Sequence, residues 1–79
     1  MSAESVPETF ATGTVLRHYK GGLYYVVGTC MIEATLKPGV LYKPHQGDSQ
    51  DIVWMRPWAE FHDMVTTQNG PVQRFVVVS

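Results

Sequence analysis

The hydrophobic residues of this chain recur at every second position, and the 3.6-residue period of a helix is missing. Together with the turn residues between segments, this alternation predicts five strands, at residues 13–19, 23–32, 40–43, 52–56 and 72–78. Lys20, Gly21 and Gly22 separate the first two strands, and the glycines permit the positive φ angles of a tight hairpin. The pattern therefore predicts an all-β fold.

The longest predicted strand, residues 23–32, is apolar on both faces. Simple alternation gives one face Leu23, Tyr25, Val27 and Met31, and the other face Tyr24, Val26, Cys30 and Ile32. A sheet with one solvated face does not suit this pattern. We therefore expect the strand to bend at Gly28 between two sheets of a small barrel. Burial of one face by a partner subunit is the alternative.

The remaining segments are shorter. Residues 33–39 are expected to form a connector, and Pro44 to end the third strand because proline cannot donate to a ladder. Residues 57–65 predict one to two helical turns, and residues 66–71 a turn. Five short strands with a helical turn before the last one match the element order of an SH3-like barrel. Another five-stranded barrel, such as an OB-type one, is the alternative.

Length and composition indicate one domain. The chain has 79 residues, of which 44% are hydrophobic and 16% charged, as in folded domains. Residues 1–10 read as a disordered leader without the pattern of a secretion signal, and residues 11–79 as the folded domain. A single cysteine permits no internal disulfide, and no apolar run reaches the ~20 residues that cross a bilayer. We therefore expect a cytoplasmic protein that does not contact membranes.

The charge balance argues against nucleic acid as a partner. The chain has seven acidic and six basic residues, so few phosphates would be neutralised and binding to nucleic acid would be weak and salt-sensitive. The cations that would have to converge are Arg17, Lys20, Lys43, Arg56 and Arg74.

Residue types also disfavour metal binding and catalysis. His18, His45 and His62 lack the short paired spacing of zinc ligands, so we expect no metal and no cofactor. Cys30 lies in an apolar strand and reads as a buried small residue. A glycine-rich phosphate loop, a nucleophile elbow and paired carboxylates are all missing from the sequence. A binding protein is therefore favoured over an enzyme.

Two segments, residues 17–24 and 54–58, combine aromatic and cationic side chains. Alternation places Trp54 and Arg56 on one face of their strand, and we expect Val53 and Met55 to be buried on the other. Trp and Arg are enriched at binding hot spots. The alternative is that Trp54 covers the barrel end while Arg56 pairs with Glu60.

Taken together, the candidate binding residues are His18, Lys20, Tyr42, Trp54, Arg56 and Arg74. Arg56 and Arg74 would hold a carboxylate or phosphate by bidentate hydrogen bonds. Tyr24, Tyr42 and Trp54 could instead form an aromatic wall for a peptide. The apolar end Phe75-Val76-Val77-Val78 is a candidate strand edge for a homo-dimer.

Several motifs carry a family resemblance. They are Gly13 with the run 17–22, Tyr24 and Val26, then Val40-Leu41-Tyr42, then Trp54, Arg56, Pro57 and Phe61, and finally Arg74-Phe75. On these motifs the chain resembles a bacterial family catalogued as domain of unknown function 1653. The resemblance implies a small SH3-like barrel and brings no activity with it. Lys37-Pro38-Gly39 departs from the simpler lead expected before the Val-Leu-Tyr strand.

The function favoured by the sequence is therefore a small module that recognises a peptide or a small anionic ligand through an aromatic and cationic surface. The alternatives are a weak nucleic-acid-binding module, or a small hydrolase-like or accessory protein that acts as a homo-oligomer.

Overall fold

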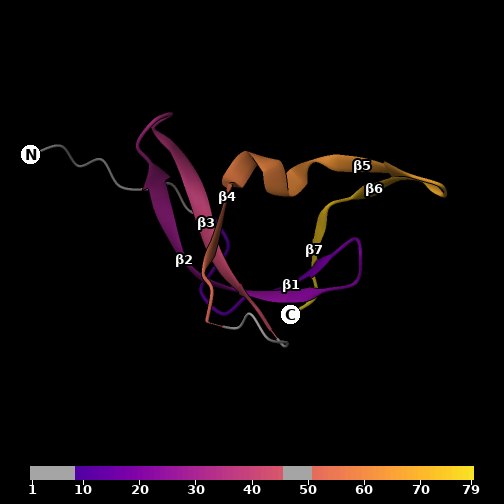
Figure 1. Cartoon of the computed structure of the whole chain (residues 1–79), viewed down its shortest axis with the longest axis horizontal. Helices are drawn as coiled ribbons and strands as arrows, with labels where there is room; N and C mark the ends of the chain where they lie inside the picture. The colour runs from indigo at the N-terminus through magenta and orange to yellow at the C-terminus, as the bar shows by residue number, and fades with distance from the viewer. Residues whose placement is uncertain (1–8, 46–50) are drawn as a thin grey trace, which may run out of the picture.

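The structure is a computed structural model that describes residues 9–45 and 51–79. Seven strands and one 3-10 helix make up this part of the chain (Figure 1). They are β1 (Val15–His18), β2 (Leu23–Ile32), β3 (Lys37–Pro44), β4 (Trp54–Pro57), η1 (Trp58–His62), β5 (Met64–Thr67), β6 (Gly70–Gln73) and β7 (Phe75–Val77). The predicted all-β character is confirmed. In the described ranges no helix has the length and apolar character needed to span a membrane.

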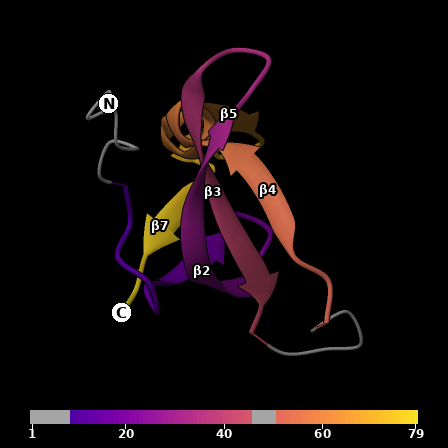
Figure 2. The ribbon, with the colours of Figure 1, turned by 90° about the vertical axis from the view of Figure 1, so that its left-hand side faces the viewer.

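Five strands form one antiparallel sheet in the order β4-β3-β2-β1-β7, while β5 and β6 form a separate hairpin. Figure 2 shows β2, β3 and β4 side by side, and Figure 1 shows the β5–β6 hairpin extending away from η1. The large sheet ends at β4 and β7, so residues 9–45 and 51–79 contain no closed barrel. The expected SH3-like barrel is therefore not confirmed.

The long strand β2 has a register irregularity at Gly28, where the sequence predicted a bend, and this irregularity exchanges the two faces of the strand. Val26 pairs with Tyr42, but after the register shift between Val26 and Gly28, Cys30 pairs with Gly39. Tyr42 and Gly39 lie on opposite faces of β3, so Cys30 lies on the face opposite to Val26. The expectation that these two residues share a face is wrong, because an irregularity of one residue inverts the alternation beyond it.

The core lies between the inner face of the large sheet and η1. Its buried members are Leu16, Val26, Val40, Tyr42, Phe61 and Phe75. Phe10 also packs there, with its ring centroid 4.8 Å from that of Trp58 and 5.5 Å from that of Phe61. Phe10 belongs to the segment 1–10 that was expected to be a disordered leader, and residues 1–8 of that segment lie outside the described residues.

Strand β4 does not bury the side chains that alternation assigned to the core. Val53 is 52% exposed and Met55 46% exposed, so the expectation that both are buried is wrong. The register Val40 to Arg56 and Tyr42 to Trp54 instead places Trp54 and Arg56 on the core side. The physical reason is that β4 is an edge strand whose outer face carries no second layer of the described chain.

Three segment boundaries also differ from the prediction. Strand β3 begins at Lys37, inside the expected connector. Residues 64–71, expected to finish a helix and then turn, belong instead to the β5–β6 hairpin, which runs to Gln73. The expected last strand divides at Arg74: Val72 pairs with β5, whereas Phe75 pairs with β1. An extended pattern in the sequence does not reveal which strand will be its partner.

Candidate anion-binding site

The turn after β1 fixes the position of His18. Gly21 donates its N–H to the main-chain oxygen of His18 at 2.7 Å, and His18 donates its N–H to Gly22 at 2.8 Å. Gly21 has a φ of +105°, which residues with a side chain rarely adopt. The N–H of Lys20 donates to Nδ1 of His18 at 3.2 Å. Because Nδ1 accepts, the proton of neutral His18 lies on Nε2, which is therefore a donor.

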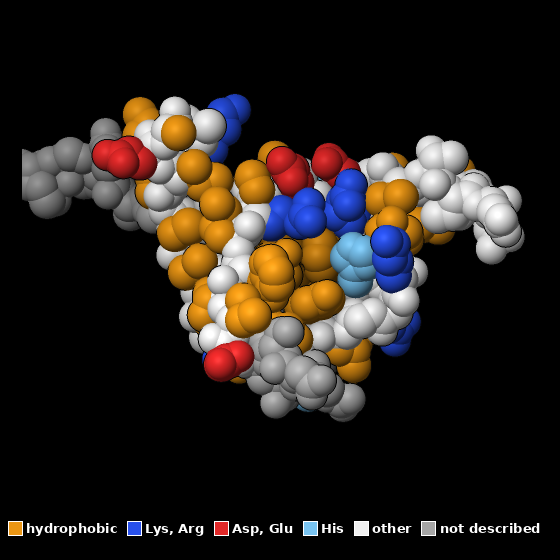
Figure 3. Space-filling model, in the orientation of Figure 1, with side chains coloured by type: hydrophobic (Ala, Val, Ile, Leu, Met, Phe, Trp, Pro, Cys, Tyr) orange, Lys and Arg blue, Asp and Glu red, His pale blue; other side chains and the backbone are white. Residues whose placement is uncertain are grey.

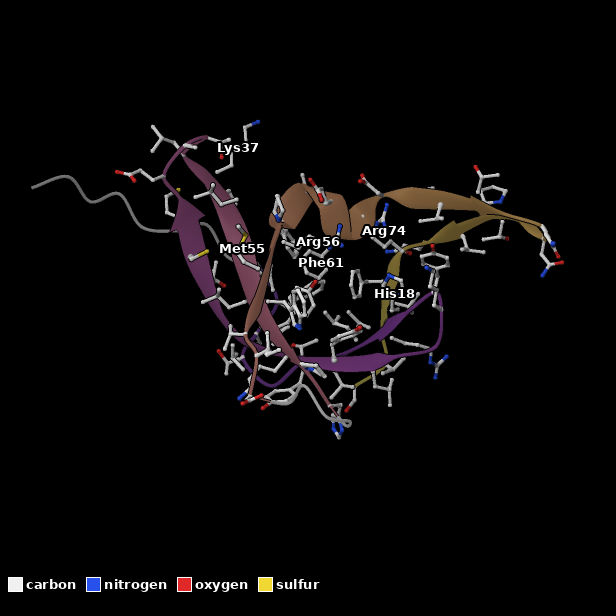
Figure 4. All side chains as sticks on the ribbon, in the orientation of Figure 1. His18, Lys37, Met55, Arg56, Phe61 and Arg74 are labelled. Atoms are coloured by element: carbon white, nitrogen blue, oxygen red, sulfur yellow. The ribbon has the colours of Figure 1, made fainter. Side chains whose placement is uncertain are left out.

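Arg74 lies where the chain leaves β6 and enters β7. Its N–H donates to the main-chain oxygen of Asp63 at 2.9 Å, and its own oxygen accepts from the N–H of Tyr19 at 2.9 Å. The backbone of Arg74 is thus held both by the residue after η1 and by the turn after β1. The Arg74 side chain lies in the same region as His18 (Figure 4).

Arg56 reaches that region from β4. Its Nη1 donates to Oε1 of Glu60 at 3.1 Å, which is the ion pair that the sequence offered as an alternative. Its guanidinium carbon lies 5.8 Å from the ring centroid of Phe75. The imidazole of His18 lies 5.0 Å from the same centroid. The buried ring of Phe75 therefore lies next to both the Arg56 guanidinium and the His18 imidazole.

Figure 4 shows His18, Arg56 and Arg74 extending into one space between β4 and η1 on one side and β1 and β7 on the other. Figure 3 shows Lys, Arg and His side chains gathered in a row above apolar ones. The Nε atoms of Arg56 and Arg74 are buried and have no hydrogen-bond partner. Leaving a buried donor unpaired costs about 1–3 kcal/mol, so these atoms are unusual features of a folded protein.

The pKa of His18 also distinguishes the region where His18, Arg56 and Arg74 meet. Burial lowers the pKa of His18, and the positive charges of Arg74, Lys20 and Arg56 lower this pKa further, in that order. His18 is therefore neutral at pH 7, while three cations surround it. We name His18, Lys20, Arg56 and Arg74 the cationic cluster. The structure thus brings together four of the six residues that the sequence proposed.

The two aromatic candidates have different environments. Tyr42 is buried, with 7% of its surface exposed, and its ring packs edge-to-face against Tyr24 and Phe75. It belongs to the core and offers no free face to a partner, so the expected wall of Tyr24, Tyr42 and Trp54 does not form at the surface. Trp54, directly opposite Tyr42 in the β3–β4 pair, is 47% exposed.

Phe75 is the residue of this site that sequence reasoning missed. Its ring contacts both His18 and Arg56 while being 3% exposed. The Arg74-Phe75 motif could have indicated that Phe75 belongs to the site, but the apolar pattern of residues 75–78 indicated a strand edge. Only the pairing of Phe75 with His18 across β7 and β1 shows that the ring faces the core.

The five cations considered for nucleic acid do not converge on one face. Arg17 pairs with Leu23, and Lys43 pairs with Tyr25, so both lie on the face opposite to Leu16 and His18. Across residues 9–45 and 51–79, no group of three His, Cys, Asp or Glu side chains is arranged to hold a metal ion.

The fold and the cluster together define a small all-β domain with a cationic site over an aromatic floor. The chain belongs to the family described as Protein of unknown function (DUF1653), whose family model matches residues 14–77. It is similar to the crystal structure of a member of this family from Bordetella bronchiseptica, with 30% identity, a TM-score of 0.73 and coverage of 87% of each chain. Among curated proteins, none matches this chain.

Proposed function

We propose that this protein is a binding module for a small anion, a phosphate or carboxylate group held by the cationic cluster. The observation that carries the proposal is the pair of buried, unpartnered Nε atoms of Arg56 and Arg74. Guanidinium groups recognise planar carboxylates and phosphates by two parallel hydrogen bonds. An anion between the two arginines would supply the acceptors that these donors lack.

The surroundings favour strong hydrogen bonds. Phe61 and Phe75 are buried beneath the arginines, and an apolar floor lowers the local dielectric and so strengthens interactions with charge. The main chain of Arg74 is fixed by hydrogen bonds on both of its sides. Such preorganisation reduces the entropy that is lost when the anion binds.

The state of His18 favours binding over proton abstraction. Its Nδ1 already accepts the Lys20 N–H, and the remaining nitrogen, Nε2, is a donor in the neutral ring. A general base needs a free acceptor directed at its substrate. His18 is thus suited to donate a third hydrogen bond to the anion.

The test is an NMR titration of the ¹⁵N-labelled chain with inorganic phosphate and, separately, acetate. We expect shifts at residues 18–20, 56 and 74–75, and we expect Arg74→Gln and Arg56→Gln each to weaken binding about tenfold or more. Arg17→Gln is the matched control, because it removes the same charge from the opposite face. Equal losses in Arg17→Gln and Arg74→Gln would show unspecific charge screening, and a spectrum without shifts would overturn the proposal.

A further inference from the structure

We infer that the anion recognised here carries a planar aromatic ring, and that Trp54 is the platform on which this ring stacks. The inference rests on the proposed anion site and adds the chemistry of the rest of the ligand. It follows from the place of Trp54 on β4, from its exposure and from the lack of any aromatic ring packed against it among the described residues.

Trp54 and Arg56 lie on the same face of β4. Their partners across the sheet are Tyr42 and Val40, which both belong to the core. Strand residues two apart are separated by roughly 7 Å. The indole and the guanidinium are therefore neighbours on one surface, and a single small molecule can contact both.

Trp54 differs from the other tryptophan of the chain. The ring of Trp58 is enclosed by Phe10 at 4.8 Å and by His62 at 4.7 Å. Trp54 is 47% exposed, and within the described ranges no aromatic ring packs against it. A half-exposed indole at a sheet edge, beside an arginine with a buried unpaired donor, has the composition of a binding hot spot.

The ligand chemistry follows from this pair. A flat ring stacks on the indole, while a phosphate or carboxylate, joined to the ring by a few bonds, reaches Arg56 and Arg74. Nucleoside monophosphates and aryl carboxylates both have this chemistry. An anion without a ring would fill the cationic cluster and leave Trp54 uncovered.

The experiment compares anions that carry an aromatic ring with one that does not. The full-length ¹⁵N-labelled chain is titrated with ribose 5-phosphate, with adenosine 5′-monophosphate and with indole-3-propionate. The two indole N–H signals act as internal reporters, because Trp58 lies packed against Phe10 and His62. We expect ring-bearing anions to bind roughly 5- to 100-fold more tightly than ribose 5-phosphate and to shift the Trp54 indole signal but not that of Trp58. Ribose 5-phosphate and adenosine 5′-monophosphate share the head group and so isolate the ring, while the titrations with inorganic phosphate and acetate identify the preferred head group.

Trp54→Ala should remove this advantage of the ring and leave the affinity for ribose 5-phosphate unchanged, while Trp54→Phe should retain part of the advantage. Met55→Ala, on the opposite face of β4 and equally exposed, is the matched control. Equal affinity for ligands with and without a ring would overturn the inference while leaving the anion site intact. If no anion binds at all, the proposed function itself fails, and this inference fails with it.

Discussion

Glu60 accepts a hydrogen bond from Nη1 of Arg56 at 3.1 Å and so occupies one arm of a guanidinium in the cationic cluster. The pair is partly solvated, with 27% of the Arg56 side chain and 48% of the Glu60 side chain exposed. Ion pairs in such surroundings contribute only about 0–1 kcal/mol to stability. Glu60 therefore matters chiefly as a competitor for the anion that Arg56 would bind.

Replacing Glu60 by Gln should strengthen anion binding. The substitution frees Arg56 and removes a negative charge, and we expect phosphate affinity to rise roughly two- to fivefold with little change in the free energy of unfolding. Calorimetric titration of the variant and the wild type measures the difference. Asp63→Asn removes the same charge from a side chain that forms no ion pair with residues 9–45 or 51–79, and it should have a smaller effect. Unchanged or weaker binding in Glu60→Gln would place the anion away from Arg56.

The lowered pKa of His18 predicts how stability depends on pH. In the unfolded chain, the imidazole of His18 takes up a proton near its ordinary pKa of about 6.5. In the folded protein, burial and the charges of Arg74, Lys20 and Arg56 make this imidazole resist protonation. The contribution of His18 to the free energy of unfolding is therefore complete above about pH 6.5. It is lost as the pH falls through the lower pKa that His18 has in the folded state.

Urea unfolding between pH 8 and pH 5 tests this dependence. We expect the free energy of unfolding to decline below about pH 6.5 and the decline to be shallower in His18→Gln. His62→Gln, which replaces an exposed side chain of η1, is the control. Identical slopes in wild type and His18→Gln would show that the environment of His18 does not resist its charge.

Gly39 is expected to tolerate no larger residue. A Cβ atom there would lie 2.8 Å from Sδ of Met55 and 3.1 Å from Sγ of Cys30. Gly39→Ala should therefore destabilise the domain by about 1–3 kcal/mol through overpacking, measured by urea unfolding. At Gly28, the nearest atom to an added Cβ is Leu41 Cδ1 at 3.9 Å, so Gly28→Ala is the matched control.

Removal of the Met55 side chain tests whether crowding against Met55 causes the loss of stability in Gly39→Ala. In a Met55→Ala background, Gly39→Ala should cost measurably less, since one of the two close sulfur atoms is gone. An undiminished cost would assign the effect to Cys30, to Ile32, whose Cγ1 would lie 3.2 Å from the added Cβ, or to the backbone.

Leu36 is expected to be a position where a substitution stabilises the protein. It has a φ of +57°, its side chain is 74% exposed, and its N–H donates to the oxygen of Ile32 at 2.7 Å. The left-handed conformation costs a residue with a Cβ about 1–2 kcal/mol. Leu36→Gly should raise the free energy of unfolding by about 1 kcal/mol, whereas Thr35→Gly, next to it in the same turn, should lower that free energy. A loss of stability in Leu36→Gly would refute the left-handed assignment.

The local features of the fold were predictable because neighbouring residues produce them. The period of two indicated strands, Gly21 and Gly22 marked a hairpin, and Gly28 marked the register irregularity of β2. The ion pair of Arg56 with Glu60 follows from their spacing of four residues at the junction of β4 and η1. Such features depend on a few consecutive residues and their conformational preferences.

The sequence by itself thus determined an all-β chain with aromatic and cationic residues in two segments. Tertiary structure alone decided that the irregularity in β2 places Cys30 opposite to Val26, and that Tyr42 is core while Trp54 is exposed. It also decided that Phe75 supports both His18 and Arg56. The physical reason is that strand partners are chosen by long-range packing, so the side on which each residue lies depends on segments far away in the chain.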